Sequence, residues 1–180
     1  MPAMFARSLV APHMRGMSRA FSRGFAAVGD KFPAVELDSG FPPKTVNMTE
    51  RLAGKKTIVI GVPGAFTPVC SMKHVPGYFA KQDAVKAKGV SEVLVVSVND
   101  GAVMEAWAKD QKVEGSMITF LADTRCELTK ALDVVFDVPV LGNTRCKRFA
   151  LVVDDGVIKA VSVAGGDVPD EETFVDAMLA

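Results

Sequence analysis

Short apolar runs with little polar alternation constrain the fold of this chain more than any other feature. Residues 57–62 read TIVIGV, residues 92–98 read EVLVVSV, and a third run covers residues 118–121. A strand with apolar side chains on both faces belongs to a sheet that is covered on both sides. Longer stretches with helical spacing separate these runs. The order predicts an α/β domain whose strands, where helices join them, cross over in the right-handed sense.

The runs and the turn signals define the expected elements. The expected strands are residues 57–62, 92–98, 118–121, 148–154 and 156–163, the last two forming a hairpin around Asp154-Asp155-Gly156. The expected helices are residues 69–88, the stretch after Asn99-Asp100 that carries Val103, Ala106 and Trp107, residues 126–132, and a last helix opened by Pro169 that carries Phe174, Ala177 and Met178. Pro76-Gly77 is expected to bend or break the first helix. The prediction is one domain over residues 28–180, with a mixed central β-sheet of the thioredoxin type flanked by helices on both faces.

The first 27 residues differ in composition from the rest. They contain four arginines and no acidic residue, which is typical of an organellar transit peptide. Arg19-Ala20-Phe21-Ser22 and Arg23-Gly24-Phe25-Ala26 resemble sites cut by the mitochondrial processing peptidase. The mitochondrial matrix is therefore the predicted location. Delivery to a chloroplast and a disordered basic tail on a cytoplasmic protein are the alternatives.

Composition excludes several functional classes. The chain from Asp30 onward carries 17 basic and 21 acidic residues, a net charge of −4 that gives no electrostatic footprint for nucleic acid. No apolar run approaches the roughly 18 residues that would span a bilayer. Three cysteines do not make a disulfide-stapled secreted scaffold. We therefore expect neither nucleic acid nor a membrane among the partners.

The loop PGAFTPVCS, residues 63–71, carries the chemistry. It lies between a buried strand and a helix, so that Cys70 falls in the first helical turn, where free backbone N–H groups and the helix dipole favour a thiolate. Thr67 lies three residues earlier, and its hydroxyl can fold back toward the sulfur. Pro63 and Pro68 stiffen the loop. A lone cysteine in a turn between a strand and a helix would be interpreted as structural, but the Thr-x-x-Cys spacing and the flanking prolines favour a reactive cysteine here.

The spacing Pro63-x-x-x-Thr67-x-x-Cys70 resembles the active-site loop of peroxiredoxins. The longer segment from Val62 to Tyr78 is similar to the type II, or fifth, subfamily. Further matches are Lys86 to Val90, Ser97 to Asp100, Trp107, Leu121 to Asp123, and Leu141-Gly-Asn143 to Phe149. The resemblance covers about residues 28–165.

The resemblance implies a thioredoxin-like fold and a thiol-dependent peroxidase that reduces hydrogen peroxide and alkyl hydroperoxides. It assigns the peroxidatic cysteine to Cys70, the hydroxyl residue to Thr67, the loop proline to Pro63 and the arginine to Arg145. Arg148 is the rival for the arginine, and only the match to Gly-Asn-x-Arg selects Arg145. His74 is expected to be a hydrogen-bonded helix residue without a role in proton transfer. The resemblance implies no cofactor and no metal site, and it suggests a homodimer packed through the active-site loops.

The chain departs from its relatives in lacking their second, resolving cysteine. Neither residues 165–180 nor the strand over residues 93–96 contains one. Cys126 and Cys146 stand elsewhere and are interpreted as small buried hydrophobes, with Cys146 the better outside candidate for a resolving role. The prediction is a one-cysteine cycle in which glutathione with glutaredoxin, or thioredoxin, reduces the Cys70 sulfenic acid.

One alternative function stays open on the sequence and another is excluded. A redox sensor or chaperone that uses oxidation of Cys70 without turnover is the alternative. A disulfide reductase of the thioredoxin type is excluded, because the residues around Cys70 form no Cys-x-x-Cys.

Overall fold

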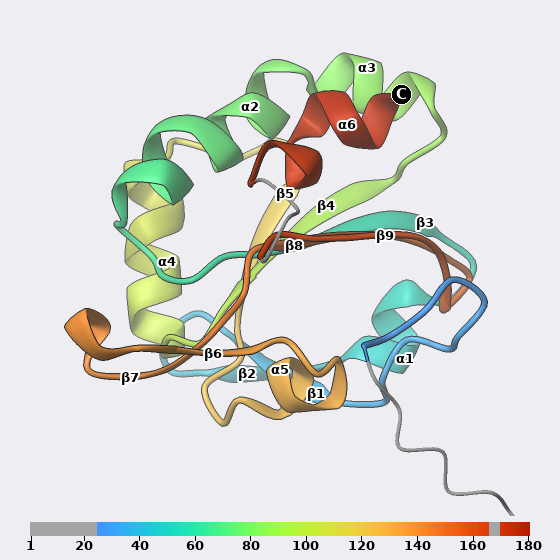
Figure 1. Cartoon of the computed structure of the whole chain (residues 1–180). Helices are drawn as coiled ribbons and strands as arrows, with labels where there is room; N and C mark the ends of the chain where they lie inside the picture. The colour runs from blue at the N-terminus through green and yellow to red at the C-terminus, as the bar shows by residue number, and fades with distance from the viewer. Residues whose placement is uncertain (1–24, 166–169) are drawn as a thin grey trace, which may run out of the picture.

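A computed structural model describes residues 25–165 and 170–180 of the chain. Its centre is a seven-stranded sheet in the order β2-β1-β5-β4-β3-β8-β9 (Figure 1). Strands β3, β4 and β5 run parallel, and β1 and β8 join this core antiparallel on either side. The strands are β1 Glu36–Ser39, β2 Lys44–Asn47, β3 Lys56–Gly61, β4 Glu92–Ser97, β5 Ile118–Ala122, β8 Phe149–Asp154 and β9 Val157–Val163. The expected mixed thioredoxin-like sheet is confirmed.

Two apolar layers cover the sheet, one on each face. Successive residues of β3 alternate between them: Ile58 and Ile60 belong to one layer and Val59 to the other. The first layer is covered by α2 Val75–Ala80, α3 Gln82–Ala87, α4 Gly101–Asp110 and α6 Val175–Leu179, and the second by α1 Met48–Leu52 and α5 Glu127–Ala131 (Figure 1). The apolar strands thus have both faces buried, as their sequence requires.

The helix expected over residues 69–88 forms in three pieces. A π-helical segment, Cys70–His74, leads directly into α2, and Lys81, with φ of −107° and ψ of 18°, separates α2 from α3. The bend or break expected at Pro76-Gly77 is not a break, because Pro76 lies in the first turn of α2, where no N–H is needed. The wide π turn before it accommodates the proline.

The remaining expected helices and the hairpin form with small shifts. Asp100 caps α4 by accepting a hydrogen bond from the N–H of Val103 at 2.9 Å. Asp155 and Gly156 have φ values of 47° and 72°, so both central residues of the β8–β9 turn are left-handed, as a two-residue hairpin turn requires.

The end of the chain differs from the expected single helix. Pro169 lies outside the described residues, and the segment that follows is a 3-10 turn, Asp170–Thr173, and then the short α6. Phe174 is the extended residue that precedes α6, with ψ at 162°, and not a helical one. The turn and α6 lie against the face that carries α2 (Figure 1).

Other elements were not expected from the sequence. They are β1, β2, α1, and a separate two-stranded ribbon of β6 Val135–Val138 and β7 Asn143–Cys146. The expected leader lies outside the described residues up to position 24, but Phe25 and Ala26 pack against the core layer that contains Val59. The described part of the chain has no helix long and apolar enough to cross a membrane.

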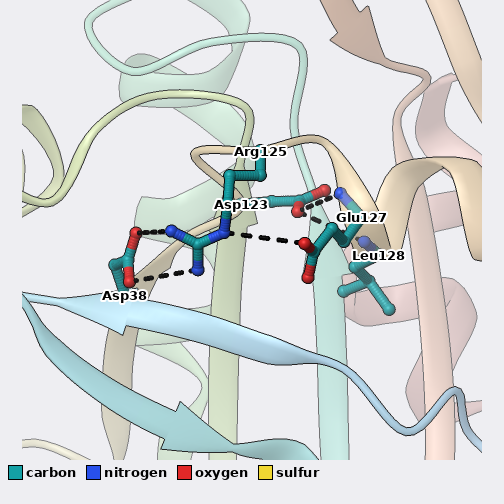
Figure 2. A network of polar contacts seen from close by, with 5 residues as sticks. All are labelled: Asp38, Asp123, Arg125, Glu127 and Leu128. Carbon is teal, nitrogen blue, oxygen red and sulfur yellow. Dashed lines mark hydrogen bonds and ion pairs between the residues drawn. The ribbon is translucent and has the colours of Figure 1, made fainter.

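A polar network holds α5 against the sheet (Figure 2). The carboxylate of Asp123 accepts hydrogen bonds from the N–H groups of Glu127, Leu128 and Thr129 and from the Thr129 hydroxyl. Arg125 bridges Asp38 on β1 and Glu127 on α5. This network lies on the face opposite the π-helical segment and serves the fold.

Candidate active site

The loop after β3 places Cys70. The Val62 N–H donates to the carbonyl of Val96, which extends the pairing with β4, and the Ala65 N–H donates to the side chain of Asn99 at 3.1 Å. The Ser71 N–H then donates to the Thr67 carbonyl at 2.9 Å and closes the first helical turn. Cys70 is therefore in that turn, as predicted, with only 1% of its surface exposed.

The pairing of β3 with β8 brings an arginine to the same place. Gly61 lies opposite Phe149, and a Cβ on Gly61 would stand 1.9 Å from the Phe149 ring. Only glycine allows this approach. Because Arg148 directly precedes Phe149, it lies at the end of β3 where the loop to Cys70 begins.

Arg148 is the arginine that contacts the sulfur. Its Nη1 donates to Cys70 Sγ at 3.4 Å, and the residue is only 6% exposed. A buried guanidinium keeps its proton, so it is a fixed positive charge beside the sulfur. This charge favours the thiolate and supplies a donor for an oxygen that becomes negative.

Arg145, which the sequence predicted at the sulfur, makes other bonds. Its Nη1 donates to the Val98 carbonyl at 3.0 Å and its Nη2 to the Leu141 carbonyl at 3.3 Å. These bonds tie β7 to the loop that follows β4. The match to Gly-Asn-x-Arg selected the wrong one of the two arginines for the sulfur contact. Arg145 lies on β7, whereas the pairing of β8 with β3 brings Arg148, the residue just before β8, next to Cys70.

Thr67 and Pro63 lie on the loop as expected, but Thr67 does not donate to the sulfur. Its hydroxyl donates to the Gly64 carbonyl at 2.9 Å, so the oxygen lone pairs are what it can offer to an incoming O–H group. Pro63 lines a cavity of about 440 Å³ next to the arginine. The other lining residues are Phe136, Lys147, Arg148, Ala164, Gly165 and Asp170.

His74 is buried and neutral, and it contacts Arg148. Its Nε2 lies 3.0 Å from the Thr173 carbonyl and its Nδ1 lies 3.1 Å from Arg148 Nη1. Because a carbonyl only accepts, Nε2 carries the proton and Nδ1 accepts from the guanidinium. Burial, together with the charge of Arg148, lowers the pKa of His74 from 6.5 to about 3. A protonated His74 would have no acceptor for the arginine.

The two other cysteines are buried thiols. Burial raises the pKa of both Cys126 and Cys146, most strongly for Cys146. Cys146 Sγ also donates to the Val62 carbonyl at 3.1 Å. Cys126 has a left-handed φ of 58° at the start of α5. Among the described residues, no three His, Cys, Asp or Glu side chains are grouped as metal ligands would be.

A cysteine in the first helical turn of a thioredoxin-like fold, hydrogen-bonded by a buried arginine, defines a class of thiol-based peroxidases. The comparisons agree. The Redoxin family model matches residues 27–179. The chain is 39% identical to peroxiredoxin-2E, chloroplastic, of Arabidopsis thaliana over 99% of this chain and 86% of that protein.

Two further relatives support the same assignment. Peroxiredoxin-2E-2, chloroplastic, of rice (Oryza sativa subsp. japonica) is 43% identical over 78% of this chain, and the match spans 65% of the rice protein. The structure of reduced Prx3 from Vibrio vulnificus in complex with hydrogen peroxide superposes with a TM-score of 0.80 at 37% identity, covering 86% of this chain and 94% of that one. The chain belongs to the Redoxin family and, within it, to the type II peroxiredoxins, which are thiol-dependent peroxidases.

The sequence signal that could have selected Arg148 was its place at the start of the hairpin. A strand over residues 149–154 that pairs with residues 56–61 puts the preceding residue beside the loop. Asp170 and Thr173 could not be found this way, because they lie in a turn outside the strands, and strand pairing does not indicate where that turn packs.

Proposed function

We propose that Cys70 is the peroxidatic cysteine and that Arg148 is its arginine. The hydrogen bond from Arg148 Nη1 to Cys70 Sγ is the observation that carries this assignment. The Cys70 thiolate attacks one oxygen of the peroxide, an S–O bond forms, and the O–O bond breaks. The other oxygen leaves as hydroxide or alkoxide and takes up a proton to become water or alcohol. Sulfur is oxidised to Cys-SOH while the peroxide gains two electrons.

Arg148 stabilises charge at two stages of this reaction. Before the attack its N–H donates to the thiolate. As the O–O bond breaks, negative charge moves to the departing oxygen, and a guanidinium fixed beside the sulfur can donate to that oxygen. Thr67 has free lone pairs for the peroxide O–H, which would hold the substrate in line. Pro63 narrows the path by which a peroxide reaches Cys70.

Hydrogen peroxide and alkyl hydroperoxides are the proposed substrates. The Vibrio vulnificus relative was solved with hydrogen peroxide, which supports the smaller substrate. The cavity beside Pro63 and Arg148 has an apolar wall in Phe136 and Ala164. An alkyl chain attached to the peroxide would find contact there.

An external thiol, glutathione with glutaredoxin or thioredoxin, is the proposed reductant of the sulfenic acid. Cys146 is fully buried, its proton is held on the Val62 carbonyl, and its pKa is raised, so little of it is thiolate near neutral pH. Cys126 is buried at the start of α5, with a raised pKa as well. Neither thiol is prepared to attack the oxidised sulfur.

A homodimer through the active-site side of the domain is the proposed assembly. Phe66, Val69 and Met72 on the loop and first helix are exposed, as are Phe136 and Val140 near the β6–β7 ribbon. The two segments that carry these groups lie next to each other, because a Cβ on Gly64 would lie 3.7 Å from the Leu141 side chain. Met72 is 76% exposed and Val140 89%, an apolar surface that a second copy would cover.

Sedimentation tests the dimer. Met72→Lys and Val140→Lys should give a monomer. Val28→Lys changes an exposed valine that is distant in sequence from both apolar groups, and it should leave the dimer intact. A wild-type protein that sediments as a monomer at tens of micromolar would refute this assembly.

Residues 1–27 are proposed to be an organellar leader, with the mitochondrial matrix as the destination favoured by the two Arg-x-Phe stretches. The names of the Arabidopsis and rice relatives favour a chloroplast instead. Import of a fusion of residues 1–30 to a fluorescent protein into isolated mitochondria and chloroplasts distinguishes the two. A fusion that enters neither organelle would refute the leader.

Turnover assays with Cys70→Ser test the central assignment. The variant should fold and lose peroxide reduction with glutathione and glutaredoxin, and with thioredoxin, because a serine hydroxyl stays protonated at neutral pH. Cys126→Ser is the matched control and should keep turnover. Activity above a trace in Cys70→Ser would contradict the proposed function.

A further inference from the structure

The C-terminal turn, Asp170–Thr173, is linked to Arg148 in two ways, one direct and one through His74. Asp170 Oδ2 lies 3.2 Å from Arg148 Nε in an ion pair. The Nε atom has no hydrogen bond of good geometry, so this contact is chiefly electrostatic. The second contact runs through His74, whose Nε2 donates to the Thr173 carbonyl and whose Nδ1 accepts from Arg148 Nη1.

The geometry of Nη1 explains what these contacts do. A guanidinium Nη1 carries two hydrogens in a plane, about 120° apart. One hydrogen is directed to His74 Nδ1 at 3.1 Å, and the other is directed to Cys70 Sγ at 3.4 Å. Fixing the first hydrogen fixes the direction of the second.

The turn itself is held as one unit. The Thr173 hydroxyl donates to the Asp170 carbonyl at 2.7 Å, and Thr173 is fully buried. The Thr173 carbonyl also accepts from the Tyr78 hydroxyl at 3.0 Å, which anchors the turn to α2. The two contacts on the arginine therefore move together.

We propose that Asp170 and His74 form an arginine clamp, in which the C-terminal turn holds the Arg148 guanidinium in the orientation that directs one N–H at the peroxidatic sulfur. Asp170 and His74 are positioning residues. They touch neither the sulfur nor the peroxide, and they act through Arg148. This proposal rests on the proposed role of Cys70 and Arg148.

Removing the Asp170 charge distinguishes two roles for Asp170: an effect of its charge on the Cys70 thiolate, and an effect on the orientation of Arg148. Asp170 is negative and pairs with the arginine that contacts the sulfur, so Asp170→Asn removes a charge that opposes a thiolate at Cys70. Charge alone would therefore leave Cys70 at least as reactive in this variant. Loss of orientation would instead slow the reaction with peroxide, which needs the N–H in place as the O–O bond breaks.

Two rate measurements on the full-length protein separate these effects. Trp107 is the only tryptophan, and its indole donates to Ser71 next to Cys70, so its fluorescence can report oxidation by peroxide in a stopped-flow instrument. Alkylation by iodoacetamide measures the thiolate without any need for the arginine to assist a leaving group. Thermal unfolding monitors the fold.

The clamp predicts opposite behaviour in the two rates. In Asp170→Asn the peroxide rate constant should fall about 10-fold or more, while the alkylation rate stays equal or rises. Asp170→Glu should recover most of the loss. Glu172→Gln, an exposed charge removal on the same turn, should change neither rate.

Two substitutions of His74 separate its two nitrogens. His74→Asn keeps an acceptor near the Nδ1 position and loses the bond to Thr173, whereas His74→Gln keeps a donor near Nε2 and loses the acceptor for Arg148. His74→Asn should react with peroxide faster than His74→Gln. Asp170 is 45% exposed on its side chain, so its variants test the clamp even if the buried histidine tolerates no change.

The outcomes are distinguishable from failure of the proposed function. If Cys70→Ser is inactive but Asp170→Asn reacts with peroxide at the wild-type rate, the clamp is wrong and the peroxidatic assignment stands. Equal loss of the peroxide and alkylation rates in Asp170→Asn would also overturn the clamp. If Cys70→Ser keeps turnover, the proposed function itself fails.

Discussion

Arg148 and Cys70 lie 78 residues apart in the sequence, yet the guanidinium Nη1 is 3.4 Å from the sulfur. The contact depends on the antiparallel pairing of β3 with β8, which brings Phe149 opposite Gly61 at the start of the active-site loop.

Removing the arginine charge should distinguish Arg148 from Arg145. Arg148→Met should slow the reaction with hydrogen peroxide by about 100-fold or more, because the donor to the sulfur and to the leaving oxygen is lost. Arg145→Met should cost much less, since that side chain bonds to two backbone carbonyls. Stopped-flow rate constants provide the comparison. A larger loss in Arg145→Met would restore the assignment expected from the sequence motif.

Stability should fall in mild acid because of His74. Its pKa is 6.5 in an unfolded chain and about 3 in the fold, so between these values the unfolded state binds the additional proton and unfolding is favoured as pH falls. The stabilisation is complete above about pH 6.5 and is lost progressively toward pH 3. From pH 7 to pH 4.5 the loss should be about 3 kcal/mol.

Urea unfolding at several pH values measures this loss, with His74→Gln as the comparison. The variant should lose less stability over the same interval, because its amide does not titrate. Parallel curves for the two proteins would mean that His74 is not the group responsible.

Gly61 should tolerate no side chain. A Cβ there would stand 1.9 Å from the Phe149 ring, so Gly61→Ala should destabilise the fold by at least about 2 kcal/mol. Gly77→Ala in α2 is the matched control, because its Cβ would meet nothing closer than 3.6 Å and alanine favours a helix. Unfolding of both variants in denaturant tests the difference, and similar stabilities would refute the close approach.

Turnover should not need the two other cysteines. The double variant Cys126→Ser, Cys146→Ser should keep near-normal activity with glutathione and glutaredoxin, since both thiols are buried and have raised pKa values. Peptide mapping without reductant supplies the second measurement. A Cys70–Cys146 or Cys70–Cys126 disulfide, with loss of turnover in the double variant, would overturn the one-cysteine cycle.

The sequence predicted the apolar central strands of the fold and missed the short elements around them. Strands β3, β4 and β5 have continuous apolar runs because both faces are covered, which makes them visible in one sequence. Strand β2 reads KTVN and β6 reads VFDV, and both are largely exposed. Such short strands have a weak pattern, and tertiary pairing decides whether they form.

The same contrast holds for the site. The placement of Cys70, Thr67 and Pro63 was predictable because one loop before a helix carries all three. The arginine was not, because Arg145 and Arg148 are close in sequence and only the register of β8 decides which one reaches the sulfur. Asp170 lies 100 residues beyond Cys70, and nothing in its local sequence indicates the ion pair with Arg148.

Trapping the first oxidation product tests directly whether Cys70 is the residue that attacks the peroxide. The reduced protein is mixed with one equivalent of hydrogen peroxide in the presence of a reagent specific for sulfenic acids, and the labelled peptide is identified by mass spectrometry. Label is expected on Cys70 alone, at a rate that falls strongly in Arg148→Met. Label on Cys126 or Cys146 with Cys70 still reduced would contradict it.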